Sequence, residues 1–181
     1  MPGYVIADVT VTDPETYADY RALTPGSIAS FDGRFLVRGG EHEVIVGSWQ
    51  PGRLVLLEFD SPARAAAWYG SPAYVEARAI RQRASTGHMV HLEGERAAQG
   101  GGGLYLILRG VRGENDIDAA GVATHGGRVL SSGRAPAVKE GSWPDGLMTV
   151  LEFNNRAAAE AWCESADARG LVGEAVLVEG A

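Results

Sequence analysis

The stretch LVLLEFDSPARAAAW occupies residues 54–68, and it belongs to a pattern that occurs twice in the chain. The pieces Gly47-Ser48-Trp49, Leu57-Glu58-Phe59 and Ala67-Trp68 recur as Gly141-Ser142-Trp143, Leu151-Glu152-Phe153 and Ala161-Trp162, each 94 positions later. All four tryptophans of the protein lie in this match. Because the three pieces keep one offset, the sequence predicts one domain that is written twice, with a diverged second copy.

The size and composition of the chain fit two small soluble units. The repeat divides the 181 residues into halves of about 90 residues, and a domain of that size is only marginally stable alone. We therefore expect the two copies to cover each other's apolar faces. The hydrophobic fraction of 45% and the charged fraction of 22% are typical of a soluble globular protein.

Charge, cysteine content and hydropathy argue against several classes of partner. The net charge is −7 and no basic run occurs, so the chain lacks the positive surface that binds nucleic acid. The single cysteine, Cys163, cannot form an internal disulfide, which agrees with a reducing cytoplasm. Neither a charged leader nor an apolar run of about 18 residues occurs, so the sequence predicts a cytoplasmic protein without a membrane span.

The first copy has the pattern of a small α+β unit. Strands are expected at residues 4–11, 34–38, 44–49, 54–59 and 89–93, and helices at residues 14–23 and from residues 62 and 72 onward. Asp13-Pro14, Ser61-Pro62 and Ser71-Pro72 each supply an N-cap and a first helical residue. The sequence Thr24-Pro25-Gly26 is expected to end the first helix. The order strand, helix, strand, strand, helix, strand predicts a ferredoxin-like unit with helices on one face of its sheet.

The second copy follows a glycine-rich linker and is shorter. Strands are expected at residues 104–108, 127–130, 138–143, 147–153 and 175–179, and helices around residues 116–123 and 155–163. Residues 90–94 match residues 176–180 at an offset of 86, so this copy has lost the counterpart of the helix at 74–83. We therefore divide the chain into a site-bearing unit at 1–95, a linker at 96–103 and a degenerate unit at 104–181.

Three stretches of the first copy carry a family resemblance. FDGRFLVRGG (31–40), LVLLEFDSPARAAAWYGSPAY (54–74) and VHLEG (90–94) resemble the bacterial family called domain of unknown function 1330, within the dimeric α+β barrel superfamily. The resemblance covers residues 1–95 and extends to 104–181 in outline. It implies an α+β fold in which two ferredoxin-like units pack sheet to sheet as an intramolecular dimeric α+β barrel. Each unit of such a barrel has a cleft between its sheet and its helices.

Aromatic and arginine side chains of the first copy form the candidate site. Aromatic rings with polar tips, together with arginines, suit an apolar ligand that carries oxygen substituents. The predicted substrate-binding residues are Tyr17, Tyr20, Trp68, Tyr69, Arg78 and Arg81, and the predicted catalytic residues are Arg38, His42, Glu58 and Tyr74. Alternation in the strand at 34–38 places Arg34, Leu36 and Arg38 on one face, where Arg38 could pair with Glu58. Such an ion pair, and tyrosines that belong to the core, are the structural alternatives.

Comparison of the two copies ranks these candidates. The second copy has Ser132, Glu152, Trp162 and Cys163 at the positions of Arg38, Glu58, Trp68 and Tyr69, and it has no counterpart of Tyr74. Residues that persist in both copies are explained by the fold. We expect the residues found only in the first copy, namely Arg38, Tyr69 and Tyr74, to serve a site.

The histidines and the cysteine give no metal-binding pattern. His88 and His91 are three residues apart, which places them on opposite faces of a strand. His42 and His125 lie apart from them in the sequence. Cys163 is predicted to be a small buried hydrophobic residue, because no base lies beside it. We predict neither a metal site nor a bound cofactor.

Three functions remain open on the sequence. The first is a cofactor-independent enzyme of secondary metabolism that cyclises, isomerises, opens or oxygenates an apolar, oxygenated small molecule such as an aromatic polyketide. The second is a small-molecule binding or stress-associated protein without turnover, and the third is a haem or metal protein. The resemblance does not choose among them, because the superfamily includes cofactor-free quinone-forming monooxygenases, polyketide cyclases, isomerases, dehalogenase-like proteins and haem enzymes. The expected partner is a small molecule, and the internal pseudo-dimer could associate into a further homodimer.

Overall fold

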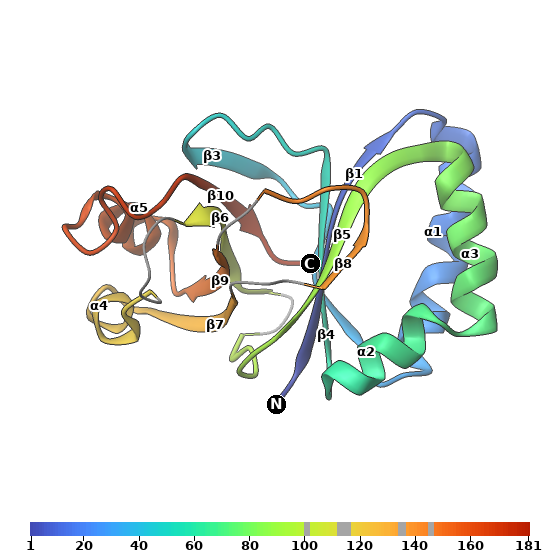
Figure 1. The fold of residues 1–181 in the computed structure, drawn as a ribbon, viewed down its shortest axis with the longest axis horizontal. Helices are drawn as coiled ribbons and strands as arrows, with labels where there is room; N and C mark the ends of the chain where they lie inside the picture. Colours follow the sequence, from blue (N-terminus) through green and yellow to red (C-terminus); the bar gives the residue numbers. More distant parts are fainter. Residues whose placement is uncertain (100–101, 112–116, 134–136, 145–146) are drawn as a thin grey trace.

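The architecture is a pair of sheets in one chain. The computed structural model describes residues 1–99, 102–111, 117–133, 137–144 and 147–181. These residues form two five-stranded antiparallel sheets that pack face to face, with helices on the outer side of each sheet (Figure 1). This arrangement confirms the predicted α+β fold, an intramolecular dimeric α+β barrel. No helix in the described part of the chain is long and apolar enough to cross a membrane.

The first sheet is built mainly from the first copy. Its strands, in spatial order, are β2 (Arg34–Arg38), β4 (Arg53–Phe59), β1 (Gly3–Val11), β5 (Ser85–Glu93) and β8 (Ala137–Glu140). The helices α1 (Pro14–Ala29), α2 (Pro62–Tyr69) and α3 (Pro72–Ala84) cover its outer face, on the right in Figure 1.

The second sheet is built mainly from the second copy. Its strands, in spatial order, are β3 (His42–Val46), β10 (Glu174–Glu179), β6 (Leu104–Val111), β9 (Leu147–Phe153) and β7 (Gly127–Gly133). The short helices α4 (Ala119–Thr124) and α5 (Arg156–Glu164) lie outside it. Turns occupy residues 166–171, where the sequence predicted that a helix had been lost.

Alternation along the central strands divides the apolar residues between two layers. On β1, Ile6 points to the second sheet and shares a buried cluster with Ile107 of β6. The intervening residues Val5 and Ala7 point to the helices and belong to a separate cluster. Since successive side chains of a strand face opposite sides, one apolar run supplies both the barrel interior and the helix layer.

Each copy contributes one strand to the sheet of the other copy. Strand β3 pairs with β10, with Val46 opposite Ala175, and strand β8 pairs with β5, with Glu140 opposite Met89. The extended segments expected at 44–49 and 138–143 therefore form shorter strands, which extend the opposite sheets. This exchange joins the two units by backbone hydrogen bonds in addition to apolar packing.

Helix α1 continues past its proline, so the expected end at Thr24-Pro25-Gly26 is wrong. The helix ends at Ala29, with Pro25 inside it. Proline lacks the backbone donor that would bond to the Arg21 carbonyl, and the Thr24 hydroxyl strengthens the preceding turn by donating to the Tyr20 carbonyl at 2.6 Å. The last turn is further held because Ile28 is only 1% exposed in the helix layer. Burial of this turn compensates for the missing hydrogen bond.

The repeated tryptophans serve the scaffold of both units. Trp49 and Trp143 meet at one end of the barrel, with ring centroids 6.0 Å apart. Trp68 packs on Phe59 at 5.3 Å, and Trp162 packs on Phe153 at 6.3 Å in the second unit. These equivalent contacts explain why the pattern persists in both copies.

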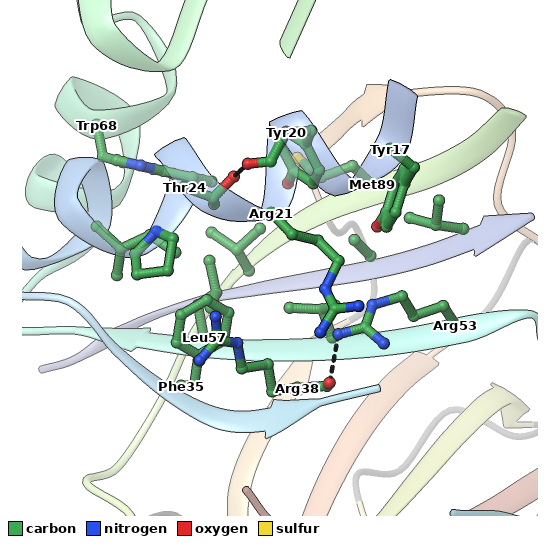
Figure 2. A pocket seen from close by; sticks show the side chains of 16 residues that line it. Tyr17, Tyr20, Arg21, Thr24, Phe35, Arg38, Arg53, Leu57, Trp68 and Met89 are labelled. Carbon is green, nitrogen blue, oxygen red and sulfur yellow. Dashed lines mark hydrogen bonds between the residues drawn. The ribbon is translucent and has the colours of Figure 1, made fainter. Parts of the chain in front are cut away.

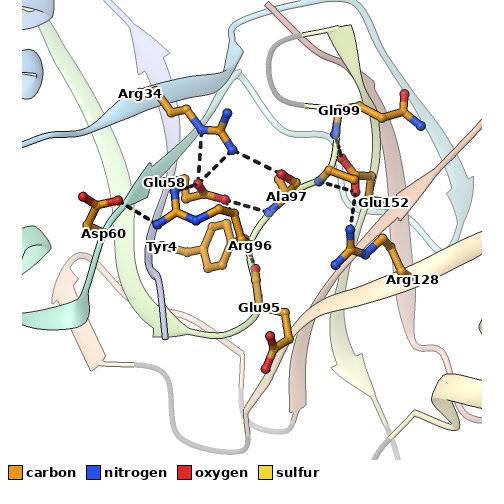
Figure 3. A network of polar contacts seen from close by, with 11 residues as sticks. Tyr4, Arg34, Glu58, Asp60, Glu95, Arg96, Ala97, Gln99, Arg128 and Glu152 are labelled. Atoms are coloured by element: carbon orange, nitrogen blue, oxygen red, sulfur yellow. Dashed lines mark hydrogen bonds and ion pairs between the residues drawn. The ribbon is translucent and has the colours of Figure 1, made fainter.

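The repeated glutamates hold the segment that connects the units (Figure 3). Glu58 is 1% exposed and accepts hydrogen bonds from the Ala97 amide at 2.8 Å and the Tyr4 hydroxyl at 3.0 Å. It also forms ion pairs with Arg34 at 2.9 Å and Arg96 at 3.0 Å. Glu58 therefore pairs with Arg34, and the predicted pairing with Arg38 is wrong.

Glu152, the counterpart of Glu58 in the second copy, binds Ala98 and Gln99 of the connecting segment. It is 2% exposed and accepts hydrogen bonds from the amides of Ala98 at 2.9 Å and Gln99 at 2.8 Å. Arg128 lies 3.9 Å from the same carboxylate. The residues that begin the predicted linker are thus fixed at one end of the barrel by both copies.

Replacing Glu58 with alanine should lower the free energy of unfolding by roughly 2–3 kcal/mol, because the buried Ala97 amide loses its acceptor and Arg34 and Arg96 lose their carboxylate partner. Arg64→Ala is the control, since the Arg64–Asp32 pair has side chains 51% and 55% exposed and should change stability by about 0.5 kcal/mol or less. Urea unfolding followed by circular dichroism measures both values. Equal losses in the two variants would contradict the structural role of Glu58.

Candidate functional site

A narrow apolar slot lies between the first sheet and helix α1. The space that the centre of a water molecule can occupy in it is about 30 Å³, and the space between its lining atoms, with the open mouth included, is about 500 Å³. Its lining consists of Val5, Ala7, Val9, Tyr17, Tyr20, Arg21, Thr24, Pro25, Ile28, Phe35, Arg38, Arg53, Val55, Leu57, Trp68 and Met89. None of these lining residues is acidic, and none is a histidine or a lysine.

The local structure explains how the slot arises. The floor is the helix-facing side of β1, where Ala7 is small and leaves space between Val5 and Val9. The roof is α1, where Tyr17, Tyr20 and the residues one turn further on recur three and four apart and so share one face. The slot is therefore a gap between a strand of small and branched residues and a helix face that carries tyrosines.

Three arginines lie at the mouth of the slot (Figure 2). Arg21 comes from α1, Arg38 from β2 and Arg53 from β4, and the Arg53 guanidinium donates to the Arg38 carbonyl oxygen. The pairing of β2 with β4 shifts register between Phe35 and Val37, and this irregularity places the Arg38 guanidinium 4.8 Å from the centre of the Phe35 ring. The expected alternation, with Arg38 on the face of Arg34, is therefore wrong.

The two tyrosines of α1 pair within the slot. Their ring centroids are 5.2 Å apart, and Tyr17 is 4% exposed. Burial raises the pKa of Tyr17, and Tyr20 raises it further, although Arg53 and Arg81 act in the opposite direction. The Tyr17 hydroxyl is therefore protonated near neutral pH and is suited to donate a hydrogen bond.

A buried polar cluster, defined as Tyr69, Tyr74, Arg81 and Glu140, lies behind the slot. Its contact with the slot wall is made by Tyr74, whose ring centroid is 3.8 Å from that of Trp68. The Tyr69 hydroxyl donates to Glu140 at 3.0 Å, and Arg81 forms an ion pair with the same carboxylate oxygen. Because Glu140 lies on the exchanged strand β8, the second copy completes the helix layer of the first.

Electrostatics keeps this cluster in one protonation state. Burial alone raises the pKa of Glu140, but Arg81 and hydrogen bonds from Arg81, Gln82 and Tyr69 lower it below its ordinary value. Burial raises the pKa of Tyr69, and the Glu140 charge raises it further. Tyr74 is fully buried, and this burial raises its pKa well above the ordinary value for tyrosine. Near neutral pH the cluster thus holds protonated tyrosines, a carboxylate and a guanidinium.

Several buried polar atoms around Tyr69 have no hydrogen-bond partner among the described residues. They are the Tyr74 hydroxyl, Arg81 Nε and His91 Nε2. The His91 ring is 5.4 Å from the Tyr69 ring, and Arg81 binds the same glutamate as Tyr69. Trp143 Nε1 and Trp162 Nε1, elsewhere in the described residues, are unpartnered in the same way, so such atoms do not by themselves mark a functional centre.

The structure separates the predicted site residues into three groups. Tyr17, Tyr20, Arg38 and Trp68 line the slot, whereas Tyr69, Tyr74, Arg78 and Arg81 lie in the helix layer behind it. Arg78 lies over the Tyr69 ring at 4.6 Å. His42 is exposed on β3 in the second sheet, and Glu58 is held at the end of the barrel. The structure therefore does not bring His42 and Glu58 to the slot.

The predicted site residues did not include Arg21, Arg53 and Glu140. Helical spacing does place Arg21 on the face of Tyr17, because it lies four residues after Tyr17, but this spacing does not distinguish a site residue from a surface residue. Arg53 follows a turn, and no local pattern relates it to the helix. Glu140 becomes part of the cluster only through the strand exchange, which no local signal in the sequence indicates.

The remaining titratable candidates lie outside the slot. His88 accepts a hydrogen bond from the Ser142 amide at 3.0 Å, whereas His91 faces the helix layer, so the two lie on opposite faces as the spacing predicted. Burial, with smaller contributions from Glu160 and Glu164, raises the pKa of Cys163 to about 11, so the thiol is protonated near neutral pH. Within the described ranges no group of three or more His, Cys, Asp or Glu residues could hold a metal ion.

Comparison with known proteins identifies the family and the fold. The family model described as domain of unknown function (DUF1330) matches residues 2–95 and 117–172. An anthrone oxidase-like protein has a TM-score of 0.54 at 13% identity, over 99% of this chain and 91% of its own. A proposed monooxygenase from Fusobacterium nucleatum subsp. nucleatum has a TM-score of 0.52 at 11% identity, over 99% and 93%.

A third similar structure, a proposed chlorite dismutase, has a TM-score of 0.51 at 10% identity, over 99% of this chain and 95% of its own. No curated protein matches the sequence. At these identities the similarity establishes a shared fold and no shared activity.

Acid should destabilise the protein through His91. Burial, and to a smaller extent the nearby Lys139, lowers the pKa of His91 from 6.5 to about 4. Between these values the unfolded chain binds a proton that the folded chain does not, so the free energy of unfolding falls as the pH falls, by on the order of 3 kcal/mol in total. Urea unfolding at several pH values should show that His91→Gln removes this component and that His125→Gln does not. Equal pH dependence in the wild type and His91→Gln would contradict it.

Proposed function

The chain belongs to the DUF1330 family, and on that premise we propose that it is a cofactor-independent enzyme acting on an apolar, oxygenated small molecule. The unit at 1–95 would carry the site, and residues 104–181 would complete the barrel. One observation carries the proposal: an apolar slot has tyrosine hydroxyls within it and arginines at its mouth, and no acidic side chain lines it.

The slot favours chemistry that passes through an anion of the substrate. An enolate or a phenolate is a common intermediate of cyclisation, isomerisation, ring opening and oxygenation. Guanidinium groups at the mouth of an apolar cavity, with no carboxylate among the lining residues, attract such an anion, although Arg21 and Arg38 are exposed to solvent. The protein would thus lower the pKa of the substrate instead of offering a strong base, which agrees with the absence of His, Asp, Glu and Lys from the lining.

Individual roles follow from position. Arg38 would stabilise the oxyanion, and the protonated Tyr17, with Tyr20 beside it, would donate a hydrogen bond to a substrate oxygen. Trp68 would supply an apolar wall. Tyr69, Tyr74, Arg78 and Arg81 would fix that wall from behind and contribute no direct contact with the substrate. Glu58 and His42 have no part in the proposal.

We infer the substrate class from the polarity of the slot lining. Phe35, Trp68 and the two tyrosines suit an aromatic body with few oxygen substituents, as in an aromatic polyketide, and the slot would widen to admit it. The anthrone oxidase-like and monooxygenase descriptions of proteins with this fold agree with that class. An enzyme that acts on such a substrate would belong to secondary metabolism and would work in the cytoplasm.

A second candidate function is binding without turnover. The lining residues include no conventional general base, and a binding or stress-associated protein needs none. The two functions differ in one measurable respect, because only the enzyme releases a product.

Anthrone is a suitable test substrate, since it is apolar and its ring-flanked CH₂ group is acidic enough to form an enolate. Its oxygenation consumes one O₂ and gives one anthraquinone and one water. We expect the protein to accelerate oxygen uptake and quinone absorbance above the rate in buffer. Arg38→Gln should lower kcat/KM by at least about tenfold, because one group that stabilises the oxyanion is lost.

Arg169→Gln is the matched control, because Arg169 is exposed in the second unit and the change in net charge is the same. It should leave the rate unchanged. Saturable binding of anthrone without product would support the binding protein instead. No binding and no acceleration would overturn both functions for this substrate class.

A further inference from the structure

Two arginines face each other across the mouth of the slot. Figure 2 shows the side chains of Arg21, from α1, and Arg53, from β4, directed toward one another. Within the described parts of the chain neither guanidinium forms an ion pair, and the partners of Arg53 are uncharged: its guanidinium donates to the Arg38 carbonyl oxygen and to the Tyr17 hydroxyl. Two like charges thus converge without a counter-charge.

This arrangement stands out against the composition of the chain. Acidic residues outnumber lysines and arginines by 23 to 16, so carboxylate partners are abundant. Many arginines lie within ion-pair distance of an aspartate or a glutamate. They are Arg34, Arg64, Arg81, Arg96, Arg109, Arg128 and Arg156. At the slot, in contrast, not one lining residue is acidic. Positive charge is therefore concentrated at one place on an acidic protein.

The physical complement of such a pair is an anion that lies between the two groups. Like charges that converge repel one another, and an intervening anion converts this repulsion into attraction. A guanidinium is a planar fork of N–H donors that matches the two oxygens of a carboxylate. Arg21 is exposed and Arg53 is half-buried, so the anion would remain at the mouth while an apolar group enters the slot.

We propose that the ligand of the slot is an aromatic carboxylate, with its carboxylate held between Arg21 and Arg53 and its ring system between α1 and the sheet. The proposal rests on the slot being the binding site, as under the proposed function, and it adds a permanent charge to the substrate class. Arg38 remains available for a charge that develops during reaction, because its guanidinium lies against the Phe35 ring.

A matched pair of probes tests this charge. The anion 2-naphthoate and the neutral 2-naphthamide have the same ring and nearly the same shape. Titration calorimetry at about 50 mM salt should show that the wild type binds 2-naphthoate about tenfold or more tightly than 2-naphthamide. Raising the salt to about 500 mM should weaken binding of the acid and leave that of the amide unchanged, because screening acts on the charge alone.

Substitution of Arg21 locates the effect. Arg21→Gln should weaken 2-naphthoate binding by about tenfold and change 2-naphthamide binding by less than about twofold. Arg83→Gln is the control, because Arg83 is exposed on α3 and carries the same charge. It should leave both affinities unchanged. Circular dichroism establishes that both variants are folded.

The outcomes separate the two claims. Equal affinity for the acid and the amide in the wild type, or equal effects of Arg21→Gln and Arg83→Gln, would overturn the carboxylate proposal while the slot remained a binding site. Binding of neither probe would count against the slot itself and against both claims. The wild-type comparison and its salt dependence hold independently of any variant that fails to fold.

Discussion

The two sheets depend on each other because each has one face that its own helices cannot cover. Ile6 and Ile107 belong to the shared interior, and neither sheet could leave that layer exposed to water. The other features build on this mutual burial. Trp49 and Trp143 close one end of the interior. Glu58 and Glu152 bind the backbone amides of the segment that connects the two units. The repeated sequence therefore encodes the scaffold of both units, and two of its residues, Leu57 and Trp68, also line the slot.

A common scaffold with unequal helix layers explains where a ligand can bind. The first unit has α1 and α3, and the gap between α1 and the sheet forms the slot. The second unit has only a short α4 in the place of α1, and turns stand where α3 would be. It contributes to the first unit instead, through Glu140 on the exchanged strand. The proposed function thus falls on one half of the molecule, while both halves contribute to the shared core.

The sequence predicted the elements well because the repeat and the capping residues are local signals. The N-caps Asp13, Ser61 and Ser71 begin helices where they were expected. The errors have non-local causes. Pro25 lies inside a helix because tertiary burial of Ile28 outweighs its local preference, and Arg38 turns to the slot because an irregular pairing reverses the alternation of β2. About half of the candidate site residues line the slot or touch its wall, whereas Glu140 could not be placed without the topology.

The exchanged strands carry one further consequence. Val46 on β3 and Glu140 on β8 occupy matching positions of the repeat. Val46 packs with the apolar cluster of the second unit, whereas Glu140 binds the polar cluster of the first. Two identical chains would have to carry the same residue at both positions, so a change that favoured one helix layer would also be imposed on the other. Joining the copies in one polypeptide removes that coupling, and natural selection can then act on each half separately.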